Sequence, residues 1–274
     1  MKRRSFLSLL AAGSATAALA DTVPSGQART VLVLLELRGG NDGLNTLAPH
    51  RDPLYRLARP TLALQDGLAL SDELALHPSL APLLPLWRER RLGFALGVGW
   101  PEPNRSHFKA QDQWATAHPT GEGPGWLAAA YAPPVTQQPL LALGPGGCSA
   151  MEGGSIPALL LTASQLQRPV PPVVEPERAG SSPILRRLLS LEQTGARELS
   201  RLRQHLAALP AGLKLPANDL GRQVALALRL IGGGACPPVL QLAQGGYDTH
   251  ANQAARHGAV LRELAAGVRC RTCR

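Results

Sequence analysis

Residues 31–37, VLVLLEL, and the stretch that follows them at 38–45, RGGNDGLN, decide the fold class of this chain. The first seven residues are apolar except for Glu36, a pattern typical of a central strand buried on both faces of a parallel sheet. The glycine-rich stretch does not lead into a second alternating strand, so it begins a crossover connection and not a hairpin.

The rest of the chain alternates strand-like and helix-like segments. Strands are predicted at 92–98 (LGFALGV), 140–143 (LLAL) and 239–242 (VLQL), and helices at 80–90, 106–117, 185–209, 220–231 and 252–266. This alternation predicts an α/β fold, with a three-layer, mostly parallel sheet flanked by helices. Residues 168–183 are proline-rich and predict an extended surface connection. The leucines on one side of helix 185–209 predict that this side is buried against the sheet or in a small cap.

The first twenty residues, MKRRSFLSLLAAGSATAALA, have the composition of an export signal. A basic start is followed by a short apolar stretch and by an A-x-A cleavage site at residues 18–20. The paired arginines resemble a twin-arginine signal, and an ordinary secretory signal is the alternative. We therefore expect residues 1–20 to direct export through the twin-arginine translocase and residues 21–30 to be a linker. The mature protein is expected to be periplasmic or secreted.

Charge and composition do not favour nucleic-acid binding. The formal net charge of +9 falls to +6 when the three basic residues of the signal are removed, and the remaining charges are scattered along the helices. Clustered basic residues and stacking rings are the usual features of a nucleic-acid surface. The apolar stretch of the signal is too short to span a bilayer, so we do not expect an integral membrane protein.

The four cysteines do not form the framework of a disulfide-rich protein. They are too few for a chain of this length, although export would permit a disulfide. The Cys-x-x-Cys near the end has no further pair of ligands beside it, which argues against a zinc site. The residues concerned are Cys148, Cys236, Cys270 and Cys273.

Asp42 lies in the glycine-rich stretch directly after the first predicted strand. Ligands of open α/β sheets bind beyond the carboxyl ends of the strands, so a carboxylate at this point can face a bound group. The alternative is that Asp42 only caps its own loop, because Asx turns are common.

Ser106 lies after a proline-containing loop, at the start of predicted helix 106–117. Serine in this position most often caps the helix. A hydroxyl at a helix N-terminus can also act as a nucleophile whose phosphate or sulfate ester is held by backbone N–H groups. Asn104, Arg105 and His107 flank Ser106 and are candidates to hold the anion.

Asp248 and His250 follow the predicted strand 239–242, and His257 lies two helical turns beyond His250 on the same side. A carboxylate beside an imidazole suits divalent zinc, manganese or iron. The alternative is that Asp248 caps the helix and the histidines lie on the surface. Polar clusters after three separate strands favour one shared site over three independent caps.

Five segments occur in the order and rough spacing that resemble the DUF1501 family of exported bacterial proteins, whose function is unassigned. They are LRGGNDGLN, DPLYRLARPTLAL, LHPSLAPL, RSHFKAQDQW and GGYDTHANQ, and the resemblance extends from residue 31 to about 267. DUF1501 proteins look like members of the alkaline phosphatase/sulfatase superfamily. The resemblance therefore implies an alkaline phosphatase-like domain over residues 31–267.

The same resemblance implies a set of site residues. Asp42, Asp248 and His250 would be ligands of a divalent metal such as zinc or manganese, with His257 as a further candidate, and Ser106 would be the nucleophile. The implied reaction is in-line attack by Ser106 on a small anionic phosphate or sulfate ester, with metal lowering the pKa of the hydroxyl. Arg105 or Asn104 would hold the equatorial oxygens of the substrate.

The end of the sequence departs from the family pattern. DUF1501 proteins continue with another strand and a late Asp-His-Gly segment, whereas residues 268–274, VRCRTCR, change composition abruptly. We therefore expect an incomplete domain with an aberrant tail at 268–274, and an inactive product. The alternative is an exported, non-catalytic binding or assembly protein with the same fold. A nucleotide-dependent oxidoreductase is not favoured, because no G-x-G-x-x-G follows the first strand.

Overall fold

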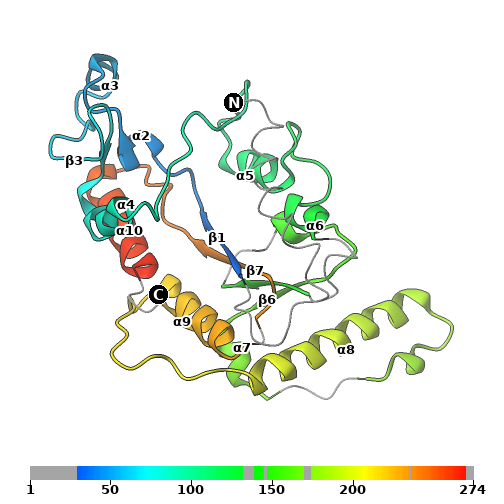
Figure 1. Ribbon diagram of the computed structural model, residues 1–274. Coiled ribbons are helices and arrows are strands. Elements are labelled where there is room, and N and C mark those ends of the chain that lie inside the picture. The colour runs from blue at the N-terminus through cyan, green and yellow to red at the C-terminus, as the bar shows by residue number, and fades with distance from the viewer. Residues whose placement is uncertain are drawn as a thin grey trace.

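The computed structural model describes residues 30–131, 139–144, 147, 149–169, 174–234 and 236–269. The predicted signal and Cys148, Cys270 and Cys273 lie outside the described residues. A four-stranded sheet in the order β1-β7-β5-β6 forms the centre, and every pair of neighbouring strands is parallel (Figure 1). Its strands are β1 (Leu32–Leu37), β5 (Leu140–Leu143), β6 (Ala158–Leu161) and β7 (Val239–Gln244). The predicted α/β class and the predicted strands at 31–37, 140–143 and 239–242 are thereby confirmed.

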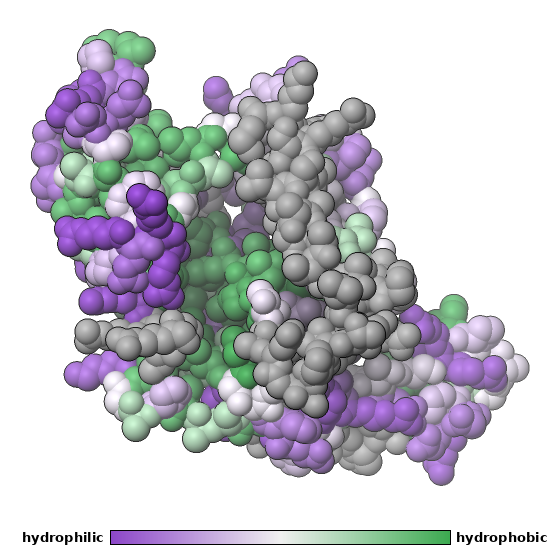
Figure 2. Space-filling view, viewed as in Figure 1, coloured by the Kyte–Doolittle hydropathy of each residue, from purple (hydrophilic) through white to green (hydrophobic). Residues whose placement is uncertain are grey.

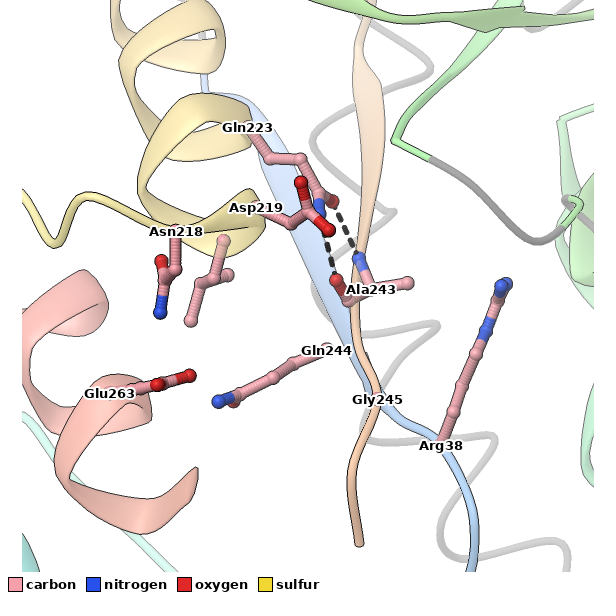
Figure 3. Close-up of a pocket in the computed structure, with 9 residues that line it drawn as sticks. Arg38, Asn218, Asp219, Gln223, Ala243, Gln244, Gly245 and Glu263 are labelled. Carbon is pink, nitrogen blue, oxygen red and sulfur yellow. Dashed lines mark hydrogen bonds between the residues drawn. The ribbon is translucent and has the colours of Figure 1, made fainter. Parts of the chain in front are cut away.

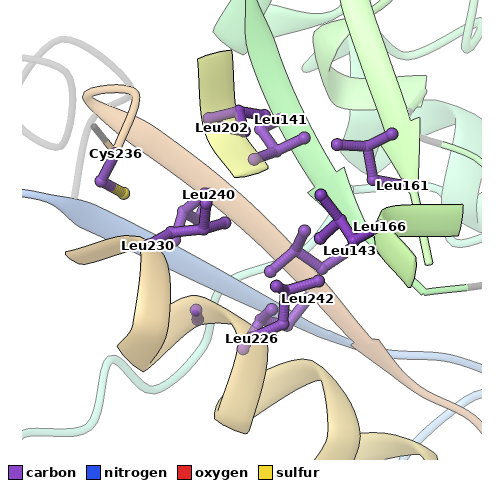
Figure 4. Close-up of a cluster of buried hydrophobic side chains, with 11 residues drawn as sticks. Leu141, Leu143, Leu161, Leu166, Leu202, Leu226, Leu230, Cys236, Leu240 and Leu242 are labelled. Carbon is purple, nitrogen blue, oxygen red and sulfur yellow. The ribbon is translucent and has the colours of Figure 1, made fainter. Parts of the chain in front are cut away.

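Helices cover both faces of the sheet, because successive side chains of a strand point to opposite faces. On one face, Leu240 and Leu242 of β7 pack against the helix α9 (Asp219–Gly232) in a core of leucines (Figure 4). On the other face, Val239 packs in a second core with α5 (His107–Thr116) and α6 (Trp126–Ala130). These three layers agree with the predicted arrangement.

The remaining elements surround this sandwich. A third core lies at the end of β1 and joins Leu37 to Tyr247 and Leu261. It lies between α10 (Gln253–Val268) and the segment of η2 (Pro78–Leu83) and α4 (Leu84–Arg88). Short strands form a separate antiparallel sheet in the order β2-β4-β3. The bounds are α2 (Gly43–Thr46), β2 (Leu47–Ala48), α3 (Pro53–Ala58), β3 (Leu68–Ala69), β4 (Ala75–Leu76), η2 (Pro78–Leu83), α4 (Leu84–Arg88), η3 (Ser149–Met151), α7 (Ala163–Gln167), η4 (Pro176–Ala179), α8 (Pro183–Gln204) and α10 (Gln253–Val268).

The position of β1 differs from the prediction. Within the described sheet β1 is an edge strand that pairs only with β7, and Leu32 and Val33 are 37% and 42% exposed. The prediction of a central strand buried on both faces is therefore wrong for the described sheet. An apolar run indicates a strand, but the number of its neighbours depends on the path of the rest of the chain.

The predicted strand at 92–98 is absent from the structure, which has no regular element at these residues. Gly97 has a positive φ of 65°, in the left-handed region, and such a backbone does not fit an extended strand. Phe94, Leu96 and Val98 remain exposed.

The predicted helices are found with small changes in their bounds, except that 80–90 is divided into η2 and α4. Pro82 lies inside η2, and Pro85 is the second residue of α4; proline disfavours one continuous helix. Residues 176–179 of the predicted extended connection form the short turn η4. The prediction that one whole side of helix 185–209 is buried is wrong, because Leu202 is the one fully buried residue of α8. Among the described residues, no helix is both long enough and apolar enough to cross a membrane.

Candidate functional site

The loop after β1 packs directly against two other segments of the predicted site. Gly39 and Gly40 have positive φ values of 98° and 78°, a conformation that favours glycine. A Cβ atom on Gly39 would lie 2.9 Å from the backbone nitrogen of Asp248, and one on Gly40 would lie 2.2 Å from Cε1 of His107. The two glycines therefore allow the segments around residues 40, 107 and 248 to meet at the carboxyl end of the sheet.

Asp248 lies between two histidines. Its Oδ2 is 3.0 Å from Nε2 of His250, and its Oδ1 is 3.5 Å from Nε2 of His107. The side chain of Asp248 is 41% exposed, so the carboxylate is open to solvent beside both rings. The structure thus brings Asp248, His250 and His107 together.

His250 adopts a backbone conformation that non-glycine residues rarely adopt. Its φ is 46°, and its side chain is 82% exposed. A left-handed conformation costs a non-glycine residue about 1 kcal/mol or more, and such strain is common at functional sites. The ring of His250 is too exposed to be held by packing. The backbone conformation of His250 instead places the ring in contact with Asp248.

Ser106 is the N-cap of α5. Its Oγ accepts a hydrogen bond from the backbone N–H of Lys109 at 3.5 Å, and Oδ1 of Asn104 accepts one from the N–H of Ser106 at 2.8 Å. The capping interpretation is therefore confirmed, and Asn104 holds the turn that precedes the helix. Ser106 and Arg105 are exposed. The next residue, His107, contacts Asp248, which connects α5 to the loop after β7.

Asp42 is held by three donors of the protein. Its Oδ1 accepts from the backbone N–H of Asn45 at 3.2 Å, which caps α2. Its Oδ2 accepts from the Arg59 guanidinium at 2.6 Å and from the side-chain amide of Gln253. The Asp42 side chain is 11% exposed, so these contacts lie mostly out of solvent. The predicted cap is confirmed, while Arg59 and Gln253 are partners that sequence reasoning did not identify.

His257 is buried beneath the loop that contains Asp42. Its Nε2 lies 3.0 Å from Oδ1 of Asn41, which also accepts from the Thr46 hydroxyl at 3.1 Å. The rings of His77 and Tyr247 meet its ring edge-on, with centroids 5.6 Å and 6.3 Å away. His257 is 2% exposed, so the alternative that it lies on the surface is wrong.

Burial lowers the pKa of both histidines in this group. For His257 the loss of hydration is the largest cause and the nearby Arg59 adds to it, while Asp42 acts in the opposite direction. For His77 burial again leads, followed by His257. Burial also raises the pKa of the Tyr247 hydroxyl. Both imidazoles are therefore neutral near pH 7, and a neutral Nε2–H of His257 donates to Asn41.

We predict that acid destabilises the fold through these two rings. A histidine whose pKa is lower in the folded state binds its proton more readily when unfolded, so the free energy of unfolding falls as the pH drops below about 6.5, the usual histidine value. Urea unfolding at a series of pH values measures this slope. The variant His257→Gln keeps an amide donor for Asn41 and is expected to flatten the slope; an unchanged slope would contradict the assignment.

Glu36, the one charged residue of the first strand, has partners in the sheet. Its Oε2 accepts from Arg38 at 2.8 Å and from the amide of Gln241 at 3.1 Å. Arg38 also donates to the carbonyl of Gly147 at 3.0 Å. The hydrogen bonds from Arg38 and Gln241 allow β1 to contain the carboxylate of Glu36, because a charge that is partly removed from water needs compensating partners.

A cleft of 420 Å³ opens beside the end of β7, on the side of α9 and α10 (Figure 3). At its centre, the amide of Gln223 donates to the Ala243 carbonyl and accepts from the Ala243 N–H, both at 2.8 Å. Asp219 and Glu263 give the cleft two acidic side chains. None of the predicted site residues lines this cleft. The candidate site is therefore the region around Asp248 and Ser106 and not the cleft.

The fit of a metal ion differs between the predicted ligands. Asp248 and His250 are exposed and adjacent, which suits a divalent cation that replaces the 3.0 Å contact between Oδ2 of Asp248 and Nε2 of His250. Asp42 has its oxygens bound by Arg59, Gln253 and Asn45, and His257 faces Asn41, so both would need to exchange partners to coordinate a metal. Within the described part of the chain, no group of three or more His, Cys, Asp or Glu side chains is arranged to hold a metal ion.

Comparison with known proteins adds no relative. No protein-family model matches the chain, and neither the curated proteins nor the solved structures searched contain a match.

Proposed function

We propose that this chain is an exported protein related to metal-dependent hydrolases of phosphate or sulfate esters, with an alkaline phosphatase-like domain of the DUF1501 type. The single observation that carries the proposal is the meeting of His107, Asp248 and His250 at the carboxyl end of a parallel sheet, with Ser106 directly before His107 in the chain. Sites of open α/β sheets lie at this edge. The strained backbone of the exposed His250 supports a chemical role over a packing role.

Asp248 and His250 are the residues that would hold a divalent metal in this proposal. A metal bound there would supply positive charge to the ester and lower the pKa of the attacking hydroxyl. Arg105 is exposed beside Ser106 and offers a guanidinium that suits the oxygens of a phosphate or sulfate group. Asp42 contributes by holding the loop that packs on Asp248.

Ser106 is the nucleophile in this proposal. Its Oγ forms a bond to phosphorus or sulfur while the bond to the leaving alcohol breaks, and the hydroxyl proton passes to the ring of His107, which Asp248 orients. The N-terminus of α5, a helix of ten residues, stabilises the anionic group that remains on the serine. Asn104 keeps the turn in place through its hydrogen bond to the N–H of Ser106.

We expect no turnover of substrate by this chain, and predict only that Ser106 becomes esterified when the chain is incubated with an aryl phosphate or aryl sulfate and zinc or manganese. Mass spectrometry of the peptide that contains Ser106 detects the phosphoryl or sulfuryl adduct. This measurement reports the transfer of the group to Ser106 and does not require hydrolysis of the adduct. The variant Ser106→Ala is expected to lose the adduct completely. Ser182→Ala, which removes the equivalent N-cap hydroxyl of α8, serves as the matched control and keeps the adduct. An adduct on another residue, or none, would remove Ser106 from this role.

A second candidate is an exported binding or assembly protein that uses the same fold without catalysis. The observation that favours it is the occupation of Asp42 and His257 by Arg59, Gln253 and Asn41. Metal analysis distinguishes the two functions. A hydrolase is expected to retain a stoichiometric divalent ion that Asp248→Ala removes, whereas a binding protein has no such requirement.

A further inference from the structure

The loop between β7 and α10 has an unfavourable backbone conformation at two residues. His250 and Asn252 have positive φ values of 46° and 52°, in the left-handed region that non-glycine residues rarely adopt. His250 is the residue whose ring lies 3.0 Å from the carboxylate of Asp248. An unfavourable backbone conformation persists only where neighbouring groups stabilise it. The contacts that hold this loop therefore determine where the ring of His250 lies.

The backbone around His250 forms a γ-turn. The N–H of Ala251 donates to the carbonyl of Thr249, two residues earlier, and His250 lies between them. A γ-turn whose central residue has a positive φ is the rare and strained form. We therefore expect this turn to need a partner from outside its own three residues.

Arg256 provides that partner. Its Nη1 donates to the carbonyl of Thr249 at 3.1 Å, so the same oxygen accepts from the guanidinium and from the N–H of Ala251. Thr249 is 6% exposed, and a buried carbonyl needs donors from the protein because little water reaches it. A hydrogen bond from a charged group is stronger than one between neutral groups. The arginine therefore holds the turn from the side of α10.

The place of Arg256 in the helix has no other evident purpose. Arg256 lies at the end of the first turn of α10, where the helix dipole disfavours a cation, and no acidic residue of that turn offsets it. Its side chain is exposed, and hydrophilic residues cover much of the visible surface on the side of α3, α4 and α10 (Figure 2). Neither the dipole nor packing in the core favours an arginine here, whereas the Thr249 carbonyl does.

We propose that Arg256 is a positioning residue of the candidate site, which keeps the ring of His250 beside Asp248 by holding the carbonyl of Thr249. The inference rests on the proposed function for the use of that pair, which is to hold a divalent metal. Without the guanidinium, His250 relaxes to a more favourable backbone conformation and its ring leaves the carboxylate. The site then loses one of its two exposed ligands, while the packed cores stay in place.

The first measurement is the affinity of the full chain for Co²⁺, whose visible absorption spectrum reports coordination by imidazole and carboxylate. Residues that orient a metal ligand contribute to affinity, and we expect Arg256→Ala to bind Co²⁺ about tenfold more weakly than the unchanged chain. Arg256→Lys keeps a cationic donor and is expected to recover part of the loss.

Arg262→Ala is the matched control. Arg262 is another exposed arginine of α10, and its Nη1 donates to the Ser79 hydroxyl at 3.3 Å, away from the γ-turn. We expect this variant to bind Co²⁺ as the unchanged chain does. Equal Co²⁺ affinities for Arg256→Ala and Arg262→Ala would overturn the proposal, because the loss would not depend on the contact with Thr249.

A second measurement does not depend on a metal. Hydrogen exchange of the Ala251 amide, followed by NMR in the metal-free chain, reports the γ-turn directly because this N–H donates to Thr249. We expect exchange about tenfold faster in Arg256→Ala, since losing one hydrogen bond from a charged group shifts a local opening equilibrium by at least that factor. The amides of α9 are expected to keep their rates, which shows that the variant remains folded.

The two measurements separate this inference from the proposed function. If the unchanged chain binds no Co²⁺, the proposed function fails at its metal, and the exchange rate of Ala251 still decides whether Arg256 holds the turn. Faster exchange in Arg256→Ala but not in Arg262→Ala supports the positioning role. An unchanged rate in Arg256→Ala would overturn it.

Discussion

Replacing Asp42 by alanine is expected to lower the free energy of unfolding by about 3 kcal/mol. The variant removes the N-cap of α2, which is worth about 1 kcal/mol, and leaves the Arg59 guanidinium without its carboxylate in a mostly buried setting. It also separates Gln253 in the first turn of α10 from the loop after β1. One carboxylate thus joins three segments that are distant in sequence, and urea unfolding measures the loss.

Asp52→Ala is the matched control for this variant. Asp52 caps α3 through the N–H of Leu54 at 2.8 Å, in an exposed position and without an arginine partner among the described contacts. We expect its removal to cost about 1 kcal/mol, as for an ordinary N-cap. Equal losses for the two variants would show that Arg59 and Gln253 do not stabilise the loop. The difference is expected to persist in a chelator, because the partners of Asp42 are side chains of the protein.

Replacing Gly39 by alanine is expected to destabilise the chain by about 2 to 3 kcal/mol. The new Cβ would lie 2.9 Å from the backbone nitrogen of Asp248 and 3.0 Å from its Cβ, and the positive φ of 98° adds backbone strain. The loop after β1 and the loop after β7 must then move apart. The change in the free energy of unfolding measures the cost, and the Ser106 adduct measures whether the site is still assembled.

Gly43→Ala is the control within the same loop. A Cβ atom on Gly43 meets no atom within 4 Å, and the residue is the first of α2. Alanine is favoured over glycine in helices and lowers the entropy of the unfolded chain, so we expect unchanged or slightly higher stability. A loss similar to that of Gly39→Ala would indicate that the loop is sensitive to any substitution and not to contact with Asp248.

The sequence predicted a strand or helix correctly where the residues of that element alone determine it. The runs LLAL and VLQL became β5 and β7, and Ser106 became the N-cap of α5. The run LGFALGV did not become a strand, because hydrophobicity alone does not report the left-handed backbone of Gly97. The leucine spacing of α8 predicted its apolar stripe, but periodicity does not reveal whether the same chain supplies a partner.

The candidate site was predictable in its location and not in its internal contacts. The rule that sites follow strand ends located Asp42 and Asp248, whereas the strand predicted before Ser106 is absent from the structure. The contacts of Asp42 with Arg59 and Gln253 join residues that are 17 and 211 positions apart, and no local pattern encodes them. The glycines at 39 and 40 permit a close approach of the backbone, but the sequence does not identify Asp248 and His107 as the residues that approach.

The pairing of β1 with β7 also determines when the site can form during synthesis. Leu32 is aligned with Val239 and Leu37 with Gln244, so the first described strand waits for a partner made more than 200 residues later. Contacts of such high sequence separation form slowly, because the intervening chain must first be ordered. The apolar β1 segment therefore lacks the strand it pairs with until the ribosome has completed β7. The candidate site therefore forms only after the loop that carries Asp248 and His250 has been translated.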